Sequence, residues 1–94
     1  MKWLEIIELR SVESNRKLFE PKLIKILDEF HGAAGKPIIK VYNRFDLDSD
    51  LSVHLLHSSS NADNNGSQVG VRLASALKEF GLLNHSIWKE KSGD

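Results

Sequence analysis

The 94 residues, 40% hydrophobic and 28% charged, have the ordinary composition of a soluble globular protein and predict one domain, residues 1–94. A chain this short buries only about 60–65% of its unfolded surface, so self-association would add useful burial. Its 13 basic and 13 acidic residues cancel, which disfavours nucleic acid as a partner. The absence of cysteine excludes disulfides, thiolate metal sites and cysteine nucleophiles.

The sequence indicates a soluble cytoplasmic protein with no membrane partner. Glu5 and Glu8 interrupt the apolar residues near the N-terminus, where a signal peptide would need a long apolar core. No apolar run approaches the roughly 20 residues that span a bilayer. A chain without cysteine also fits a reducing compartment.

The hydrophobic pattern predicts strand, helix, strand, strand, helix and strand, in that order. The strands are short runs rich in β-branched and aromatic residues, and the helices repeat their apolar residues at a spacing of three to four. A polar stretch, residues 58–66, predicts a surface loop that could act as a lid. The expected strands are residues 2–10, 38–44, 51–57 and 82–90, and the expected helices are residues 15–31 and 67–80.

Pro21 leaves the start of the first helix open, because proline inside a helix removes a hydrogen bond and kinks the chain. Either the regular helix begins near Glu20, or residues 14–20 form a separate first turn. Ser14 or Asn15 would cap that turn.

Both helices have an apolar stripe and a glycine just past the end. Ser67 is the expected N-cap of the second helix, and Gly32 and Gly81 are the expected stops. The stripes are Leu23, Ile26, Leu27 and Phe30 in the first helix, and Val69, Leu73, Leu77 and Phe80 in the second.

This element order is typical of the α+β ferredoxin-like βαββαβ sandwich. Right-handed crossovers place both helices on one face of a four-stranded antiparallel sheet of order 4-1-3-2, with the first strand central. By alternation the other face carries apolar side chains, among them Tyr42, Leu56 and Trp88. An exposed apolar face of this size indicates an interface. We therefore expect a homodimer through the open sheet face.

On this pattern the sequence resembles the dimeric α+β barrel superfamily, whose best-known members are the antibiotic-biosynthesis-type monooxygenases. The resemblance covers nearly the whole chain and rests on the charged, β-rich strand Trp3–Arg10, the two helices, and the closing strand Gly81–Trp88. It implies a homodimer in which two sheets pack face to face into a barrel. It implies no particular activity, because the superfamily includes cofactor-free oxygenases, haem-degrading enzymes, dehydratases and sensors.

The resemblance also bears on cofactors. Haem-degrading members use an axial histidine borne on a helix, whereas His31 here lies at a helix exit. This departure argues against haem, and we expect no cofactor.

Two short motifs are incomplete. Asp46, Asp48 and Asp50 have the spacing that opens a calcium loop, but the glycine and the final glutamate of such a loop are missing. An acidic hairpin turn explains them better. The segment Gly32–Lys36 follows a helix and lacks the Ser or Thr of a phosphate-binding loop. Neither a metal nor a nucleotide is expected.

Three strand histidines are the candidate catalytic residues, because imidazole suits acid–base chemistry near neutral pH. Alternation places His57 and His85 on the helix side of the sheet and His54 on the open side. His57 and His85 could therefore line one cavity between sheet and helices, where superfamily members hold substrates. Hydrogen-bonded structural histidines are the alternative.

Aromatic side chains are the candidate ligand-binding residues. Trp3, Tyr42 and Trp88 could stack on an aromatic ligand, although core or interface packing is the commoner role of such residues. Asn84 precedes His85 and could orient a substrate or a water, unless it only starts the strand or forms a β-bulge.

Carboxylates in the central strand need partners, because a buried unpaired charge costs several kcal/mol. Glu8 could pair with Arg10, Lys40 or Arg44 on the open side of the sheet. Glu5 lies on the same strand. An interface ion pair is the expected role of such a carboxylate, and a catalytic acid is the alternative.

Two functions remain open on the sequence alone. The first is a small homodimeric domain that binds a hydrophobic or aromatic ligand between sheet and helices. The second is a cofactor-independent monooxygenase-like enzyme with a cavity lined by Trp3, His57 and His85.

Overall fold

The computed structural model describes residues 2–11, 16–29, 37–46, 50–58 and 65–91. The predicted element order is confirmed, and each predicted strand lies within two residues of its expected bounds. The elements are β1 (Trp3–Ser11), α1 (Arg16–Glu29), β2 (Ile38–Asn43), β3 (Asp50–His57), α2 (Gln68–Leu77), the 3₁₀ turn η2 (Lys78–Phe80) and β4 (Gly81–Lys89).

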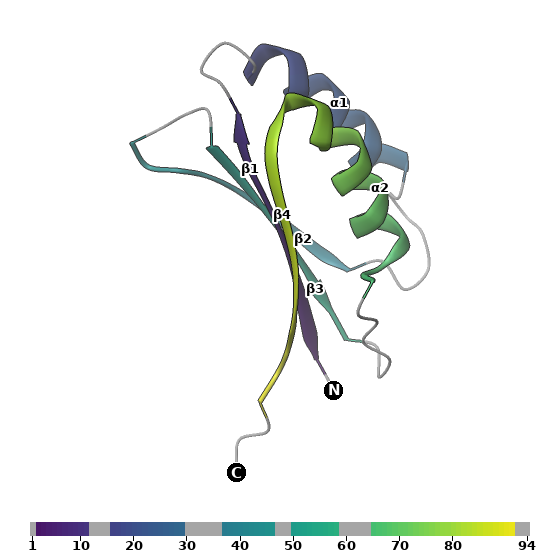
Figure 1. Cartoon of the computed structure of the whole chain (residues 1–94). Coiled ribbons are helices and arrows are strands. Elements are labelled where there is room, and N and C mark those ends of the chain that lie inside the picture. Colours follow the sequence, from purple (N-terminus) through teal and green to yellow (C-terminus); the bar gives the residue numbers. More distant parts are fainter. Residues whose placement is uncertain (1, 12–15, 30–36, 47–49, 59–64, 92–94) are drawn as a thin grey trace.

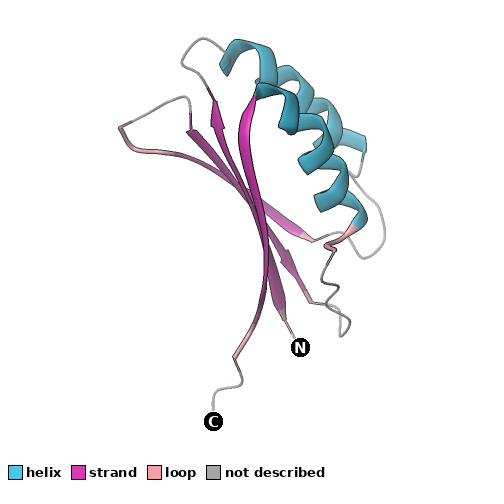
Figure 2. Ribbon diagram, in the orientation of Figure 1, coloured by secondary structure: helices cyan, strands magenta, loops and turns pink. Residues whose placement is uncertain are grey.

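The four strands form one antiparallel sheet of order β2-β3-β1-β4, which confirms the predicted topology with β1 in the interior. Both helices cover the same face of this sheet, and the other face is bare (Figures 1 and 2). The fold is therefore α+β and ferredoxin-like, as the sequence indicated.

The hydrophobic core lies between the sheet and the two helices. Every second residue of β1 and β3 is buried against the helices, as the two-residue period of a strand requires. The apolar stripes of α1 and α2 complete the core from the other side. Its buried members are Ile7, Leu9, Leu23, Ile26, Leu51, Val53, Leu55, Val69, Leu73, Ala76 and Leu77.

Helix α1 continues through Pro21 from a start at Arg16, so both expectations for its beginning were wrong. Proline removes one hydrogen bond of the helix. Burial of Leu23 and Ile26 on the next turns opposes that loss, because apolar packing supplies most of the stability of a helix in a protein. The expected caps Ser14 and Asn15 lie outside the described residues, as do Phe30 and Gly32.

The face of the sheet away from the helices has the apolar character that alternation predicted. Large apolar side chains from all four strands point to this side, and most of them are exposed. We call this surface the open face. Its apolar members are Leu4, Ile6, Ile38, Tyr42, Leu56, Leu82 and Trp88.

The expected ion pair of Glu8 is absent from the described residues. Two of the three cations expected to pair with it lie instead near Asp50, with Arg10 Nε at 3.9 Å and Arg44 Nη1 at 3.3 Å from Asp50 Oδ2. Glu8 is exposed, so water can solvate its charge without a partner.

No helix in the described ranges has the length and apolar character needed to cross a membrane.

Candidate functional site

The sheet register brings one carboxylate and two histidines together on the helix side. Glu5 lies opposite Leu55 of β3 and Ile87 of β4. His57 follows Leu55 by two residues and His85 precedes Ile87 by two, so both share the face of Glu5 and are its diagonal neighbours. A long side chain reaches such a diagonal neighbour across a sheet.

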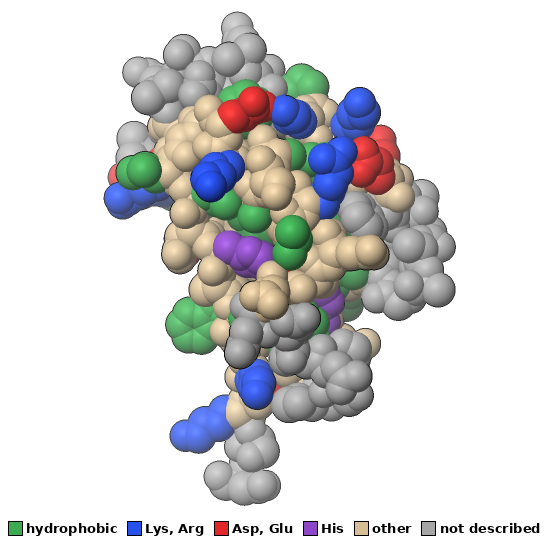
Figure 3. Space-filling view, turned by 45° about the vertical axis from the view of Figure 1, so that its right-hand side comes forward, with side chains coloured by type: hydrophobic (Ala, Val, Ile, Leu, Met, Phe, Trp, Pro, Cys, Tyr) green, Lys and Arg blue, Asp and Glu red, His purple; other side chains and the backbone are tan. Residues whose placement is uncertain are grey.

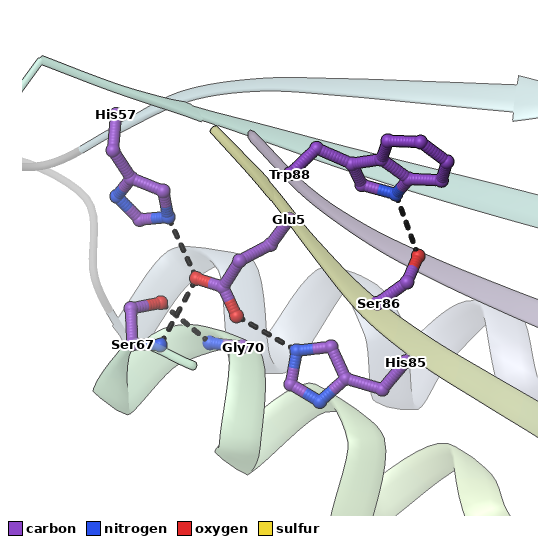
Figure 4. Close-up of polar contacts among 7 residues, drawn as sticks. All are labelled: Glu5, His57, Ser67, Gly70, His85, Ser86 and Trp88. Carbon is purple, nitrogen blue, oxygen red and sulfur yellow. Dashed lines mark hydrogen bonds and ion pairs between the residues drawn. The ribbon is translucent and has the colours of Figure 1, made fainter. Parts of the chain in front are cut away.

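The carboxylate of Glu5 binds both imidazole rings. Nε2 of His57 lies 2.6 Å from Oε1, and Nε2 of His85 lies 2.8 Å from Oε2 (Figure 4). Three strands that are adjacent in the sheet thus meet at one buried carboxyl group. We call Glu5, His57 and His85 the buried triad.

The N-terminus of α2 provides further donors to this carboxylate. The backbone N–H of Ser67, the N-cap residue, donates to Glu5 Oε1 at 3.0 Å. The Ser67 hydroxyl accepts from the N–H of Gly70 at 3.1 Å, which confirms the predicted cap. The positive end of the helix dipole also favours a negative charge at this point.

Glu5 is ionised at neutral pH despite being fully buried, with 0% of its surface exposed. Burial alone would raise its pKa. The hydrogen bonds from the Ser67 side chain, His85, the Ser67 backbone and His57 together outweigh burial, so the pKa lies below its ordinary value. A carboxylate only accepts, so each Nε2 carries a hydrogen and each Nδ1 is left as the basic ring atom.

Two glycines allow the helix to come this close to the sheet. A Cβ on Gly70 would lie 2.0 Å from Glu5 Oε2. A Cβ on Gly66 would lie 2.6 Å from the same oxygen and 2.7 Å from His85 Cε1, and Gly66 also has a φ of +88°. Side chains at either position would displace the carboxylate or the helix.

A hollow of about 360 Å³ adjoins the triad at the end of the sheet where β1 begins and β4 ends. Trp3 and His57 form part of its wall, and their rings stack with centroids 3.9 Å apart and planes 15° apart. His85 is not among the residues that line it. The lining residues are Lys2, Trp3, Leu4, Ile38, Leu56, His57, Ser58, Trp88, Lys89 and Glu90.

His54 lies away from the triad, on the open face. Its ring is near the Ser52 hydroxyl, at 3.1 Å, and its centroid lies 4.8 Å from that of Tyr42. The predicted separation of His54 from the other two strand histidines therefore holds in the structure.

The remaining candidate residues, Asn84 and Trp88, also belong to the open face. Asn84 is exposed opposite Glu8. Trp88 lines the hollow, is 57% exposed, and donates from Nε1 to the Ser86 hydroxyl at 2.9 Å. Of the five predicted ligand-binding residues, only Trp3 and Trp88 line the hollow.

The two incomplete motifs gain no support. Asp46 and Asp50 pair with Arg44, as in an acidic hairpin turn, whereas Asp48 and the segment Gly32–Lys36 lie outside the described residues. Among the residues that the structure describes, no group of three or more acidic, histidine or cysteine side chains could hold a metal ion.

Solved structures of other proteins share this fold at low sequence identity. SnoaB from Streptomyces nogalater, named a cofactor-independent oxygenase, is 12% identical with a TM-score of 0.71, over 97% of this chain and 94% of that one. Rv0793 from Mycobacterium tuberculosis is 12% identical with a TM-score of 0.73, over 98% and 97%. A protein named antibiotic biosynthesis monooxygenase is 5% identical with a TM-score of 0.73, over 95% and 98%.

The chain has the fold of the antibiotic-biosynthesis-monooxygenase-like α+β barrel proteins. The resemblance seen in the sequence is thus confirmed at the level of the fold. No protein-family model and no curated protein matches the sequence. At these identities the likeness establishes the architecture alone, and the activity has to be argued from the residues of the site.

The close approach at Gly70 predicts that Gly70→Ala destabilises the protein by about 1–3 kcal/mol, the usual range for overpacking. The sign of this change separates the close contact from helix propensity, because propensity alone would make alanine more stable than glycine by about 1 kcal/mol. Urea unfolding measures the change. Ser75→Ala, on the exposed side of the same helix, is the control and should change stability by less than about 0.5 kcal/mol. A stabilised Gly70→Ala protein would contradict the contact.

The lowered pKa of Glu5 predicts that the protein loses stability in acid. A carboxylate whose pKa is lower in the folded state stabilises fully above its unfolded pKa of about 4.3. That contribution disappears as the pH falls through the lower, folded pKa. The difference in unfolding free energy between wild type and Glu5→Gln should therefore be largest near neutral pH and shrink below about pH 4.3.

Urea unfolding at a series of pH values measures this difference. Asp28→Asn is the control, because Asp28 is exposed on α1, away from the open face, and has no ion partner among the described residues. Its difference from wild type should stay small throughout. Parallel curves for wild type and Glu5→Gln would contradict the ionised, buried carboxylate.

Proposed function

We propose that this chain is a homodimeric domain that binds a small hydrophobic or aromatic molecule in the hollow at the end of the sheet. The stacked pair of Trp3 and His57 in its wall is the observation that carries this proposal. Flat aromatic walls favour flat ligands through offset stacking. A volume of about 360 Å³ falls within the range of small-molecule sites.

The ligand site we propose differs in position from the cavity expected between sheet and helices. Near Glu5 that space is filled by the N-terminus of α2, because Gly66 and Gly70 let the helix approach closely. The hollow opens instead at the end of the sheet, and residues of both faces line it. Trp3, His57 and Trp88 are therefore the ligand-binding residues we propose. His85 does not line the hollow and acts only through its hydrogen bond to Glu5.

The homodimer we propose forms through the open face. Seven large apolar side chains gather there, and two helices already cover the opposite face. An apolar sheet face of this kind is stabilised by a second sheet packed against it. We place the protein in the cytoplasm, because a chain without cysteine needs no oxidising compartment.

Dimerisation would also shape the ligand site. Leu4, Leu56 and Trp88 belong both to the open face and to the lining of the hollow. A partner packed on the open face would therefore close the hollow further and exclude water from a bound ligand.

A cofactor-independent monooxygenase-like enzyme is the second candidate. The observation that favours it is the Glu5–His57 pair, because a carboxylate that holds an imidazole is a common device for activating a base. The same hollow would then hold the substrate. SnoaB, which has this fold, is named a cofactor-independent oxygenase.

Native mass spectrometry of the purified protein tests the first candidate. We expect twice the chain mass of 10.6 kDa, and any additional mass would identify a retained ligand. Ile6→Glu places a charge at the centre of the open face and should weaken the dimer by about 100-fold or more, because burying an unpaired charge costs several kcal/mol. Ile24→Glu, on the exposed side of α1, is the matched control and should stay dimeric.

Two results would contradict this proposal in different ways. A monomer at micromolar concentration would remove the dimer but leave the hollow available to a ligand. Equal dissociation of the Ile6→Glu and Ile24→Glu proteins would show that the dimer uses another surface.

A further inference from the structure

Within the four strands, the charged side chains on the open face are Glu8, Arg10, Lys40 and Asp50. Arg10 and Asp50 lie directly opposite each other on β1 and β3, with Arg10 Nε 3.9 Å from Asp50 Oδ2. Glu8 and Lys40 are exposed, and neither forms an ion pair with a residue that the structure describes. The open face of a single chain therefore leaves one negative and one positive charge to water.

The two unpaired charges lie on either side of β3. Glu8 on β1 is directly opposite Ser52 of β3, and Lys40 on β2 is directly opposite His54 of β3. Their positions are thus separated by two strand spacings, about 10 Å, and by a step of two residues along the strands. This separation explains why the two side chains form no ion pair within the chain.

Several charges on the helix side of the molecule are paired within the chain. Acidic and basic side chains lie next to one another there (Figure 3), as in the ion pairs of Lys22 with Glu79 and of Arg72 with Glu29. Those pairs stay in water whether or not the open face is covered. Glu8 differs from them, because it lies unpaired on the face that the proposed dimer covers.

We propose that Glu8 of each copy pairs with Lys40 of the other copy in a twofold-symmetric dimer. This inference rests on the proposed function, because it takes the open face as the dimer interface. A second copy packed on this face removes water from both side chains, and a buried charge without a partner is strongly unfavourable. In a twofold interface each contact occurs twice, with the two copies exchanging roles. One reciprocal arrangement thus satisfies the unpaired charges of both copies.

The residues between Glu8 and Lys40 can form the centre of such an interface. The twofold axis lies midway between two reciprocal contacts, so it passes over β3 between Ser52 and His54. The Ser52 hydroxyl and His54 Nε2 lie 3.1 Å apart and hydrogen-bond each other. A second copy can therefore cover these two bonded atoms without leaving them unpaired. Ile6, directly opposite His54 on β1, adds an apolar side chain beside them.

The test reverses each charge and follows assembly by native mass spectrometry. Glu8→Lys or Lys40→Glu alone sets like charges against each other at both contacts of the dimer. Each variant should dimerise about 100-fold more weakly than wild type. Asp28→Lys and Lys25→Glu, both exposed on α1, change the net charge of the chain by the same amounts. These matched controls should dimerise as wild type does.

Mixing the two variants tests the reciprocal pairing itself. The Glu8→Lys chain has lysine at both positions, and the Lys40→Glu chain has glutamate at both. A mixed dimer therefore places opposite charges at both contacts and should form about as tightly as the wild-type dimer. Uniform nitrogen-15 labelling of one chain separates the mixed dimer from the symmetric dimers by mass. Cooperative urea unfolding of each variant confirms that it is folded.

The outcomes separate the pairing from the proposed dimer. Weak dimers of each variant alone and a tight mixed dimer support the pairing. If Ile6→Glu dissociates the wild-type dimer but the folded charge variants form no mixed dimer, the pairing is overturned and the proposed dimer stands. Charge variants that dimerise alone as tightly as wild type overturn the pairing as well. A monomeric wild-type chain, or a dimer that Ile6→Glu leaves intact, overturns both.

Discussion

Much of this structure depends on a negative charge that is buried at the centre of the sheet. Glu5 is wholly inaccessible, and its carboxylate is satisfied only because donors converge on it from β3, β4 and the first turn of α2. Removing one partner from a buried charge typically costs about 3–5 kcal/mol. The register of three strands and the position of one helix are therefore coupled through a single side chain, since a slip of one residue would leave the charge unpaired.

The arrangement around Glu5 explains features that apolar packing alone would not require. A helix that buries valine and leucine needs no glycine in its first turn, yet a side chain at Gly70 would occupy the place of the carboxylate. Gly66 is needed both for its φ of +88° and for the space beside His85. The close approach also fills the space between sheet and helix near the triad, and the hollow that we propose as the ligand site lies instead at the end of the sheet.

The fold was predictable from the sequence because local patterns and topology rules agree with each other. The parity of His57 and His85, combined with a central first strand, placed both histidines on the helix side, as the structure shows. The same two rules put Glu5 on this face between the two histidine-bearing strands, so this pairing was also predictable from the sequence. The close contacts of Gly66 and Gly70 depend on how near α2 lies to the sheet, a distance that no periodicity encodes.

The sequence pattern also could not predict that α1 continues through Pro21, because tertiary packing of Leu23 and Ile26 competes with the penalty of proline. The hollow belongs to the same class of features. It lies where the beginning of β1 and the end of β4 meet, and its lining joins residues of opposite parity, such as Trp3 and Leu4. Alternation assigns such neighbours to separate surfaces, so a shared site at the end of a sheet escapes it.

The most direct examination of the buried triad is nitrogen-15 NMR of the histidine rings at neutral pH. Correlations between ring nitrogens and ring protons distinguish the two neutral tautomers. We expect His57 and His85 both to carry the hydrogen on Nε2, with the Glu5→Gln protein losing this pattern at one or both rings. Hydrogens on Nδ1 of both rings in the wild-type protein would contradict the ionised carboxylate between them.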